Sequence, residues 1–269
     1  DSTNFGINAK LITGLTNGEM YFYQITAFDK TGYESEKSAE VDVTPTTTSA
    51  YNVKTDGTGD FTSIQKAIDT AISGDSVFIY AGTYDSIRVD SKSIQIIAGS
   101  GPVNSIIDPK GKTTAVILSG YPNQTSITGF TIKGGVGDQN KDGLGGGIRV
   151  EPGVEAKIDN CIITGNEDGA IYFGDSSKTE VSNVLVYGND KSFIVKSGIA
   201  NLINCTFAEE TQSSAMSTGA SLNFINTIFM DEIAADDTVN NISLWANHSL
   251  FQYGEATFNS NLIKNYNWG

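Results

Sequence analysis

The stretch "KIDNCIITGNEDGAIYFGDSSKTEVSNVLVYGND", residues 157–190, carries one pattern twice. Asn160 and Asn183 each stand in a run of mostly apolar residues, and each is followed by a Gly-Asn-acid sequence, which Asp168 follows in the first unit and Asp190 completes in the second. The spacing continues along the chain at 21 to 23 residues, through Asn160, Asn183, Asn204, Asn226 and Asn247, with Gly129 at the same place in an earlier unit. A repeat of this length is typical of a solenoid.

Two apolar columns accompany these asparagines. Two positions before them stand Ile158, Val181, Leu202, Phe224 and Trp245, and three positions after them stand Ile163, Val186, Phe207, Phe229 and Leu250. Because the units show no helical periodicity, we predict stacked strands, that is, an all-β, right-handed parallel β-helix with coils about 4.8 Å apart. Leucine-rich repeats share the period, but their Leu-x-x-Leu-x-Leu consensus is missing.

The five repeated asparagines have two possible roles. Asparagine tolerates a left-handed backbone, and its amide can bond to the turn of the next coil. We therefore predict a structural ladder; a polar binding stripe is the alternative.

The cysteines Cys161 and Cys205 fall in one column two coils apart, with Val184 between them. Twice the strand spacing is too far for a disulfide. We predict two reduced, buried thiols.

Composition narrows the functional classes. The chain has 269 residues with 39% apolar residues, 29 glycines, five prolines and a net charge of −14. Nucleic acid and membrane surfaces are poor partners for such a charge, and no apolar run is long enough for membrane insertion. The single histidine, His248, argues against a histidine metal cluster or a Ser-His-Asp triad unless it is the base itself.

Residues 1–46 differ from the rest of the chain. They alternate through Tyr21 and Tyr23, turn, and continue through Val41 and Val43, which predicts a β-hairpin. The segment Leu15–Tyr21 resembles the tyrosine corner of a fibronectin type III domain. We expect the C-terminal part of such a domain at 1–46, a linker at 47–50 and the β-helix at 51–269. The chain would then begin inside a domain, and its C-terminus, which shows no polar cap, would be truncated or docked on a partner.

Residues 53–101 carry a more specific resemblance. "DGTGDF", "TSIQKAID" and "VFIYAGTY" resemble the opening of the pectin methylesterase-like and pectate-lyase-like β-helix proteins. Ile64, Ala67, Ile68 and Ala71 stand at helical spacing and predict a short helix near 63–72, with Thr62 and Gln65 as a capping box. The resemblance implies that this helix caps the first coil.

The same resemblance implies catalytic aspartates on adjacent coils, and Asp168 and Asp190 stand at the matching positions. The surroundings depart from the family, because Glu167 replaces an oxyanion-binding glutamine and no arginine follows the two aspartates. The alternative is therefore that Asp168 and Asp190 are ordinary turn residues. A lyase would need a basic residue near a cation-bound uronate, and Lys178, Lys191 and Lys196 are the nearby lysines.

Two further sites are suggested by residue type. Asp138, Asn140 and Asp142, followed by Gly143, have the spacing that begins a calcium loop, so Ca²⁺ is the one cofactor indicated; Arg149 stands where the last ligand would be. Tyr172 and Tyr187 are candidate carbohydrate-stacking residues. The alternative to the calcium site is an ordinary flexible loop. The alternative to carbohydrate stacking is that the two tyrosines are isolated surface residues.

These features predict an extracellular or cell-surface β-helix protein that binds or presents to polysaccharide, without catalysis in this chain. Two alternatives stay open. One is a lyase or pectin-esterase-like enzyme that uses Asp168 and Asp190. The other is an adhesive or filament-forming protein, partnered with other surface proteins, in which the solenoid is a spacer.

Overall fold

The structure is a computed structural model that describes residues 12, 14–16, 18–45, 48–121, 124–137, 143–212, 214–217 and 219–230, together with the backbone of strands between 233 and 267. The chain divides into two compact units, Leu11–Ser49 and the part that begins at Ala50.

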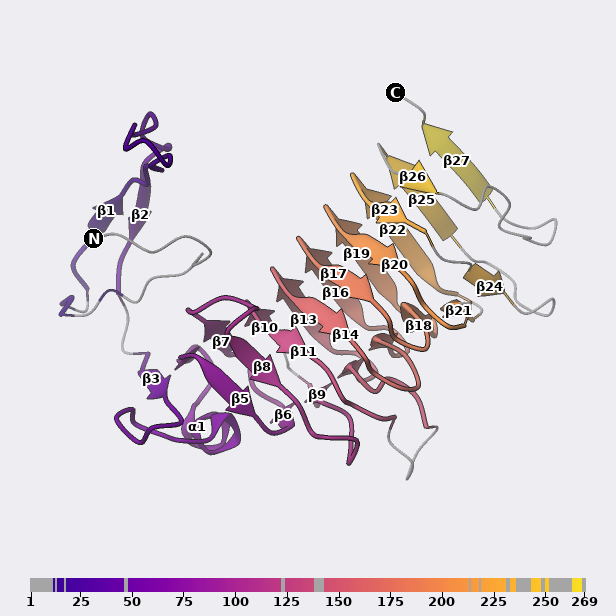
Figure 1. The fold of residues 1–269 in the computed structure, drawn as a ribbon, viewed down its shortest axis with the longest axis horizontal. Coiled ribbons are helices and arrows are strands. Elements are labelled where there is room, and N and C mark those ends of the chain that lie inside the picture. The colour runs from indigo at the N-terminus through magenta and orange to yellow at the C-terminus, as the bar shows by residue number, and fades with distance from the viewer. Residues whose placement is uncertain are drawn as a thin grey trace. The chain divides into compact units, whose positions relative to one another are not determined.

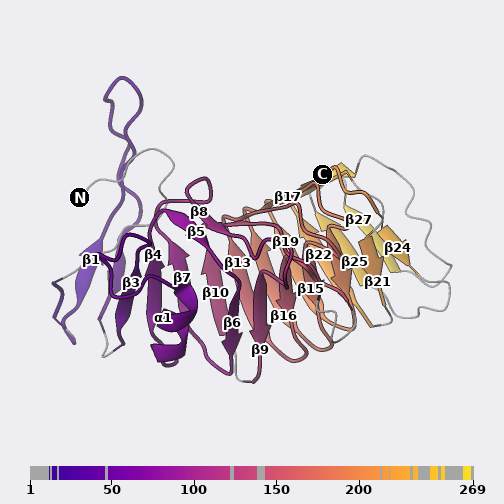
Figure 2. The same ribbon diagram turned by 60° about the horizontal axis from the view of Figure 1, so that its bottom comes forward.

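The second unit is a parallel β-helix whose three sheets run along its axis (Figures 1 and 2). The ten-stranded sheet contains β3 (Ala50–Val53), β4 (Ser76–Ile79), β7 (Gln95–Ala98), β10 (Gln124–Thr128), β13 (Glu155–Asp159), β16 (Lys178–Ser182), β19 (Ile199–Ile203), β22 (Ser221–Ile225), β25 (Ser243–Asn247) and β27 (Ile263–Asn267). The eight-stranded sheet contains β5 (Gly82–Tyr84), β8 (Ser105–Ile107), β11 (Thr131–Ile132), β14 (Ile162–Thr164), β17 (Leu185–Tyr187), β20 (Thr206–Ala208), β23 (Ile228–Phe229) and β26 (Leu250–Phe251). The seven-stranded sheet contains β6 (Ile87–Asp90), β9 (Val116–Ser119), β12 (Ile148–Val150), β15 (Ile171–Phe173), β18 (Phe193–Val195), β21 (Ser214–Met216) and β24 (Ile233–Ala235).

The strand register follows the predicted apolar columns as far as β23. Ile158, Val181, Leu202 and Phe224 are paired in successive strands, and Ile163, Val186, Phe207 and Phe229 form the second column. The prediction is wrong for the last unit. Trp245 pairs with Asn223, Leu250 with Ile228 and Asn247 with Ile225, one position away from the expected partners. That coil is one residue longer than its asparagine suggests, so Asn247 does not continue the asparagine column.

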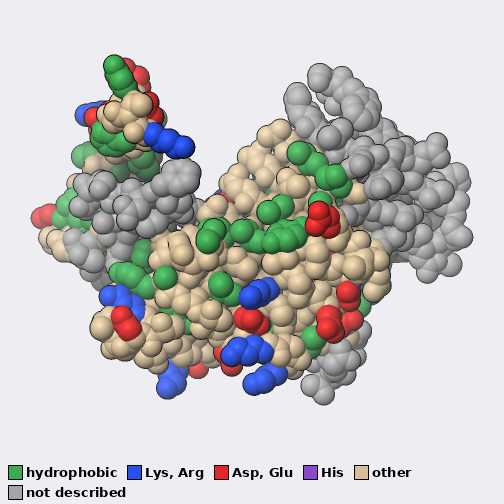
Figure 3. Space-filling view, viewed as in Figure 1, with side chains coloured by type: hydrophobic (Ala, Val, Ile, Leu, Met, Phe, Trp, Pro, Cys, Tyr) green, Lys and Arg blue, Asp and Glu red, His purple; other side chains and the backbone are tan. Residues whose placement is uncertain are grey.

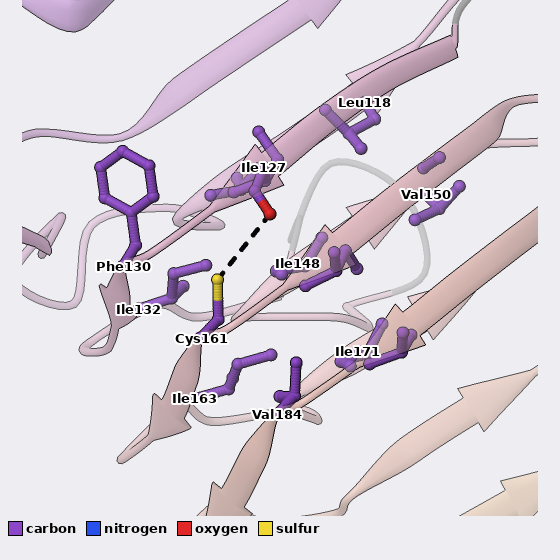
Figure 4. Close-up of a cluster of buried hydrophobic side chains, with 14 of the residues drawn as sticks. Leu118, Ile127, Phe130, Ile132, Ile148, Val150, Cys161, Ile163, Ile171 and Val184 are labelled. Atoms are coloured by element: carbon purple, nitrogen blue, oxygen red, sulfur yellow. Dashed lines mark hydrogen bonds between the residues drawn. The ribbon is translucent and has the colours of Figure 1, made fainter. Parts of the chain in front are cut away.

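The core is a column of aliphatic and aromatic side chains enclosed by the three sheets. Figure 4 shows one stretch of it, where Phe130, Ile148, Ile163 and other apolar residues from successive coils point toward one another. Farther along, Phe193, Phe207, Phe224 and Phe229 form a ring cluster with centroids 5.5–6.4 Å apart. Each coil completes the core of its neighbour.

Helix α1 (Ile64–Thr70) covers the first coils and buries Ile64, Ala67 and Ile68. The predicted capping box is wrong, because the N-cap is Ser63 and no side chain caps the helix. Gln65 instead bonds to the backbone of β6. Its amide donates to the Arg88 carbonyl (3.1 Å), and its carbonyl accepts from the Arg88 N–H (2.8 Å).

The asparagine column turns the chain from the ten-stranded to the eight-stranded sheet. Asn160, Asn183, Asn204 and Asn226 have φ between 49° and 56°, and Gly129 has φ 85°. The Asn183 amide donates to the Asp159 carboxylate (2.9 Å), the Asn204 amide to Asn183 Oδ1 (3.3 Å), and the Asn226 amide to Asn204 Oδ1 (2.7 Å). The ladder lies at an exposed corner.

Both cysteines are free and buried, as predicted from their column. The Cys161 thiol donates to the Asp159 carbonyl at 3.2 Å and also faces the Ile127 carbonyl at 3.9 Å (Figure 4). Burial raises the pKa of Cys161 to about 12 and that of Cys205 to about 11. Both side chains therefore act as small apolar groups.

The first unit contains an antiparallel pair, β1 (Tyr21–Tyr23) and β2 (Val41–Val43), which is the expected hairpin. The Tyr21 hydroxyl accepts a hydrogen bond from the Thr16 N–H (3.0 Å) and donates to Glu19 (3.1 Å). The assignment of residues 1–46 to the fibronectin type III fold stays a prediction.

Candidate functional site

Asp168 and Asp190 lie in the turns that lead from the eight-stranded to the seven-stranded sheet, on adjacent coils. The Asp168 N–H donates to Asp190 Oδ2 at 3.0 Å, and the Thr211 hydroxyl donates to Asp190 Oδ1 at 3.3 Å. The Asp168 carboxylate accepts the Gly137 N–H at 3.2 Å. Asp168 itself has φ 59°. Both carboxylates are thus hydrogen-bond acceptors that connect one coil to the next.

A buried amide ladder beside these aspartates was not predicted as such. Asn166 and Asn189 are each 2% exposed. The Asn166 amide donates to Asn189 Oδ1 (2.9 Å), the Asn189 amide donates to Glu210 Oε1 (3.2 Å), and Asn166 Oδ1 accepts the Gly135 N–H (3.0 Å). The signal was present in the sequence, because these are the asparagines of the repeated Gly-Asn-acid turns. The ladder was predicted for Asn160 and its equivalents, because their apolar neighbours made that column the more regular one.

Arg149, on β12, is buried on the outer side of the seven-stranded sheet. Its neighbours Ile148 and Val150 face the core, so alternation directs Arg149 outward, yet it is only 3% exposed. It donates to Glu151 (3.1 Å) and to the Leu144 carbonyl (2.8 Å), and its guanidinium lies 4.2 Å from the centre of the Tyr172 ring. The guanidinium is therefore engaged in packing and pairing.

The two candidate stacking tyrosines do not form one face. Tyr172 is 5% exposed beneath Arg149, and a Cβ on Gly145 would lie 2.6 Å from the Tyr172 Cβ, so the backbone of the loop crosses the tyrosine closely. The expectation of an exposed, sugar-stacking Tyr172 is thus wrong, because the loop before β12 covers that sheet. Tyr187 belongs to the eight-stranded sheet and is 37% exposed, together with Leu185 and Ile228. Apolar side chains gather over this face in Figure 3.

The remaining predicted site residues are the calcium candidates and three lysines. Asp138, Asn140 and Asp142 lie outside the described residues. Within the part of the chain that the structure describes, no group of three or more His, Cys, Asp and Glu side chains could hold a metal ion. Lys191 and Lys196 flank β18, whereas Lys178 begins β16 and pairs with Glu155.

The outer face of the ten-stranded sheet carries a shallow groove of about 360 Å³ over β10, β13, β16 and β19. Its outward side chains are Gln124, Glu155, Lys157, Lys178, Glu180 and Asn201. Lys157 pairs with Glu180 (2.7 Å), and Lys178 pairs with Glu155 (3.3 Å). Sequence reasoning missed this face, because its charged residues look like ordinary surface residues until the register places them together.

The fold has counterparts among solved structures. Pectin methylesterase from Aspergillus niger, in deglycosylated form, aligns with a TM-score of 0.53 and 12% identity over 81% of this chain and 90% of that chain. Pectin methylesterase from carrot aligns with a TM-score of 0.44 and 13% identity over 82% of this chain and 88% of that chain. A family 28 exopolygalacturonase from Yersinia enterocolitica aligns with a TM-score of 0.32 and 14% identity over 93% of this chain and 69% of that chain.

In sequence, the chain matches no protein-family model and no curated protein. No helix among the described residues is long and apolar enough to cross a membrane. At such low identity, the similarity to the Aspergillus niger esterase establishes a shared parallel β-helix fold.

Proposed function

We propose that this chain is an extracellular or cell-surface β-helix protein that binds or presents to polysaccharide and performs no catalysis itself. The first part is supported by the fold, which is similar to that of a pectin methylesterase. The high net negative charge disfavours nucleic acid and anionic lipid as partners.

The proposal that the chain performs no catalysis is supported chiefly by the hydrogen bonds that Asp168 and Asp190 accept. An acyl-transfer site of this kind needs a carboxylate that is available to the substrate and donors directed at the charge that develops. Here Asp190 accepts the Asp168 N–H and the Thr211 hydroxyl, and Asp168 accepts the Gly137 N–H. Arg149 is buried against Glu151 and Tyr172 and supplies no exposed donor for a developing charge.

The first unit fits the same proposal. Its hairpin and the contact between Tyr21 and the Thr16 N–H support a fibronectin type III-like module. Such a module would serve as a spacer or adhesive element that presents the solenoid.

A glycan array probed with the whole chain tests binding, and two assays test catalysis. Methanol release from esterified pectin reports an esterase, and formation of unsaturated uronates reports a lyase. We expect binding to at least one polysaccharide and background rates in both assays. Turnover that disappears in Asp168→Ala would contradict the non-catalytic part; an array with no bound glycan would contradict the binding part and favour the spacer alternative.

A further inference from the structure

The groove on the ten-stranded sheet combines hydrogen-bonding groups in a regular grid. Glu155 and Lys157 stand on β13, and Lys178 and Glu180 stand directly opposite on β16, because the register pairs Glu155 with Lys178 and Lys157 with Glu180. Each charge therefore has an opposite charge across the strand pair and another along its own strand. The intervening side chains Ala156, Ile158, Thr179 and Val181 are buried, so the four charged groups share the outer face.

These four side chains are open to a ligand. The lysines are 55% and 65% exposed, and the glutamates are 41% and 42% exposed. Neighbouring coils extend the grid with amides: the Gln124 amide donates to Glu155 Oε2 (2.9 Å), and Asn223 donates to Asn201 Oδ1 (2.6 Å). Successive strands of the grid are about 4.8 Å apart along the solenoid axis, which is comparable to the length of one pyranose unit in a sugar chain. The row through Glu180 continues with the polar Asn201, whereas the row through Lys178 continues with Ile199.

The charge of the groove is balanced. Its two lysines are matched by its two glutamates, in a chain with a net charge of −14. The Lys157 pKa is raised, chiefly by its hydrogen bond to Glu180, so the ammonium group is protonated and paired at neutral pH. A uronate carboxylate bound to either lysine would lie beside the glutamate that pairs with it, so the two anions would repel each other. The field of the whole molecule would also oppose its approach.

We propose that this groove binds a neutral, hydroxyl-rich polysaccharide chain laid along the solenoid axis, in preference to a polyuronate. A sugar hydroxyl both donates and accepts, so it can bridge a carboxylate and the adjacent ammonium group without breaking their pair. This inference rests on the proposed function and places its binding site on the ten-stranded sheet, away from Asp168 and Asp190.

The test uses the whole chain and two commercial polymers, a neutral galactan and polygalacturonate, in affinity electrophoresis at low and high salt. We expect retardation by the galactan that changes little with salt, and weak retardation by polygalacturonate. In the variant K157A/E180A the galactan affinity should fall about tenfold, as expected for the loss of two net hydrogen bonds. The variant E155Q/E180Q leaves the lysines without their acidic partners, so it should gain salt-sensitive binding to polygalacturonate.

The matched control removes a partly exposed ion pair elsewhere. Lys133 and Asp108 pair at 3.9 Å next to the eight-stranded sheet, so K133A/D108A should bind like the parent chain.

Galactan binding unchanged in K157A/E180A would show that the groove is not the binding site and would leave the proposed function standing. If the parent chain preferred polygalacturonate, with binding that weakened at high salt, the proposed preference for a neutral polysaccharide would be wrong. Binding of neither polymer, nor of any glycan on the array, would refute the proposed function together with the groove. Circular dichroism confirms that each variant is folded.

Discussion

At the residue scale, asparagine acts in two different ways in this molecule. Asn183 and its equivalents occupy a left-handed turn at an exposed corner, where the side chain is tolerated because it is short and polar. Asn166 and Asn189 are buried and satisfy backbone groups of neighbouring coils. The first kind fixes the turn, and the second kind fixes the stacking of the coils.

The turn role can be separated from the hydrogen bond by two substitutions. Asn183→Ala loses the bond to Asp159 and keeps a Cβ at φ 56° without the short polar side chain that makes this left-handed backbone tolerable, which should lower the free energy of unfolding by about 2 kcal/mol. Asn183→Gly loses the bond without the steric penalty and should cost about 1 kcal/mol. Urea denaturation measures both. Equal losses would show that backbone strain contributes nothing at this turn.

The buried asparagines predict a larger loss. Asn166→Ala removes an amide that donates to the Ile132 and Thr164 carbonyls and leaves the Gly135 N–H without its acceptor, which should cost about 3 kcal/mol. The exposed Asn226 serves as the comparison in Asn226→Gly, for which a loss of about 1 kcal/mol is expected. A loss below that of Asn226→Gly would mean that water replaces the buried ladder.

The cysteines give a pH-dependent prediction. Their pKa values are raised from the ordinary value of 9.0 to about 12 and about 11. The neutral thiols therefore contribute stability below pH 9, and this contribution is lost as the pH rises from 9 toward those values. At pH 8 iodoacetamide should leave the folded chain unmodified and add two groups after denaturation without reductant. Mass spectrometry measures the additions; rapid modification of the folded chain would contradict the burial.

At the scale of the element, each coil is held by core residues from its neighbours. Phe207 on β20 contacts the rings of Phe193 and Phe229 on adjacent coils. Phe207 and Phe229 could be predicted from the apolar columns, because a strand in a solenoid alternates inward and outward. The coil that contains β25 could not be placed correctly, because its register pairs Asn247 with Ile225, one position away from Asn226, although the sequence around Asn247 keeps the local pattern.

The aromatic cluster offers a test of this shared core. Phe207→Ala should lower the free energy of unfolding by about 4 kcal/mol, since it empties a fully buried ring site. The control is Tyr187→Ala on the neighbouring strand, where the side chain is 37% exposed and the expected loss is smaller, about 1 kcal/mol. Similar losses for the two variants would show that the cluster is poorly packed.

At the scale of the whole molecule, the repeat was enough to predict the architecture, but it did not predict the functional site. Period, strand composition and the resemblance of residues 53–101 were enough to predict a parallel β-helix with a short helix near its first coil. The candidate site was harder, because burial depends on what covers a sheet. Tyr172 and Arg149 lie on an outward position, yet the loop before β12 buries them. The polar groove arises from residues of separate coils and becomes recognisable only with the register.

The role of the turn acids is the point on which the whole account depends. Asp190→Ala removes an acceptor of the Asp168 N–H and of the Thr211 hydroxyl. The most direct measurement is the free energy of unfolding of this variant beside its turnover of esterified pectin and polygalacturonate. We predict a loss of about 2 kcal/mol and background turnover by both the parent chain and the variant. Turnover by the parent chain that vanishes in Asp190→Ala with unchanged stability would contradict the account.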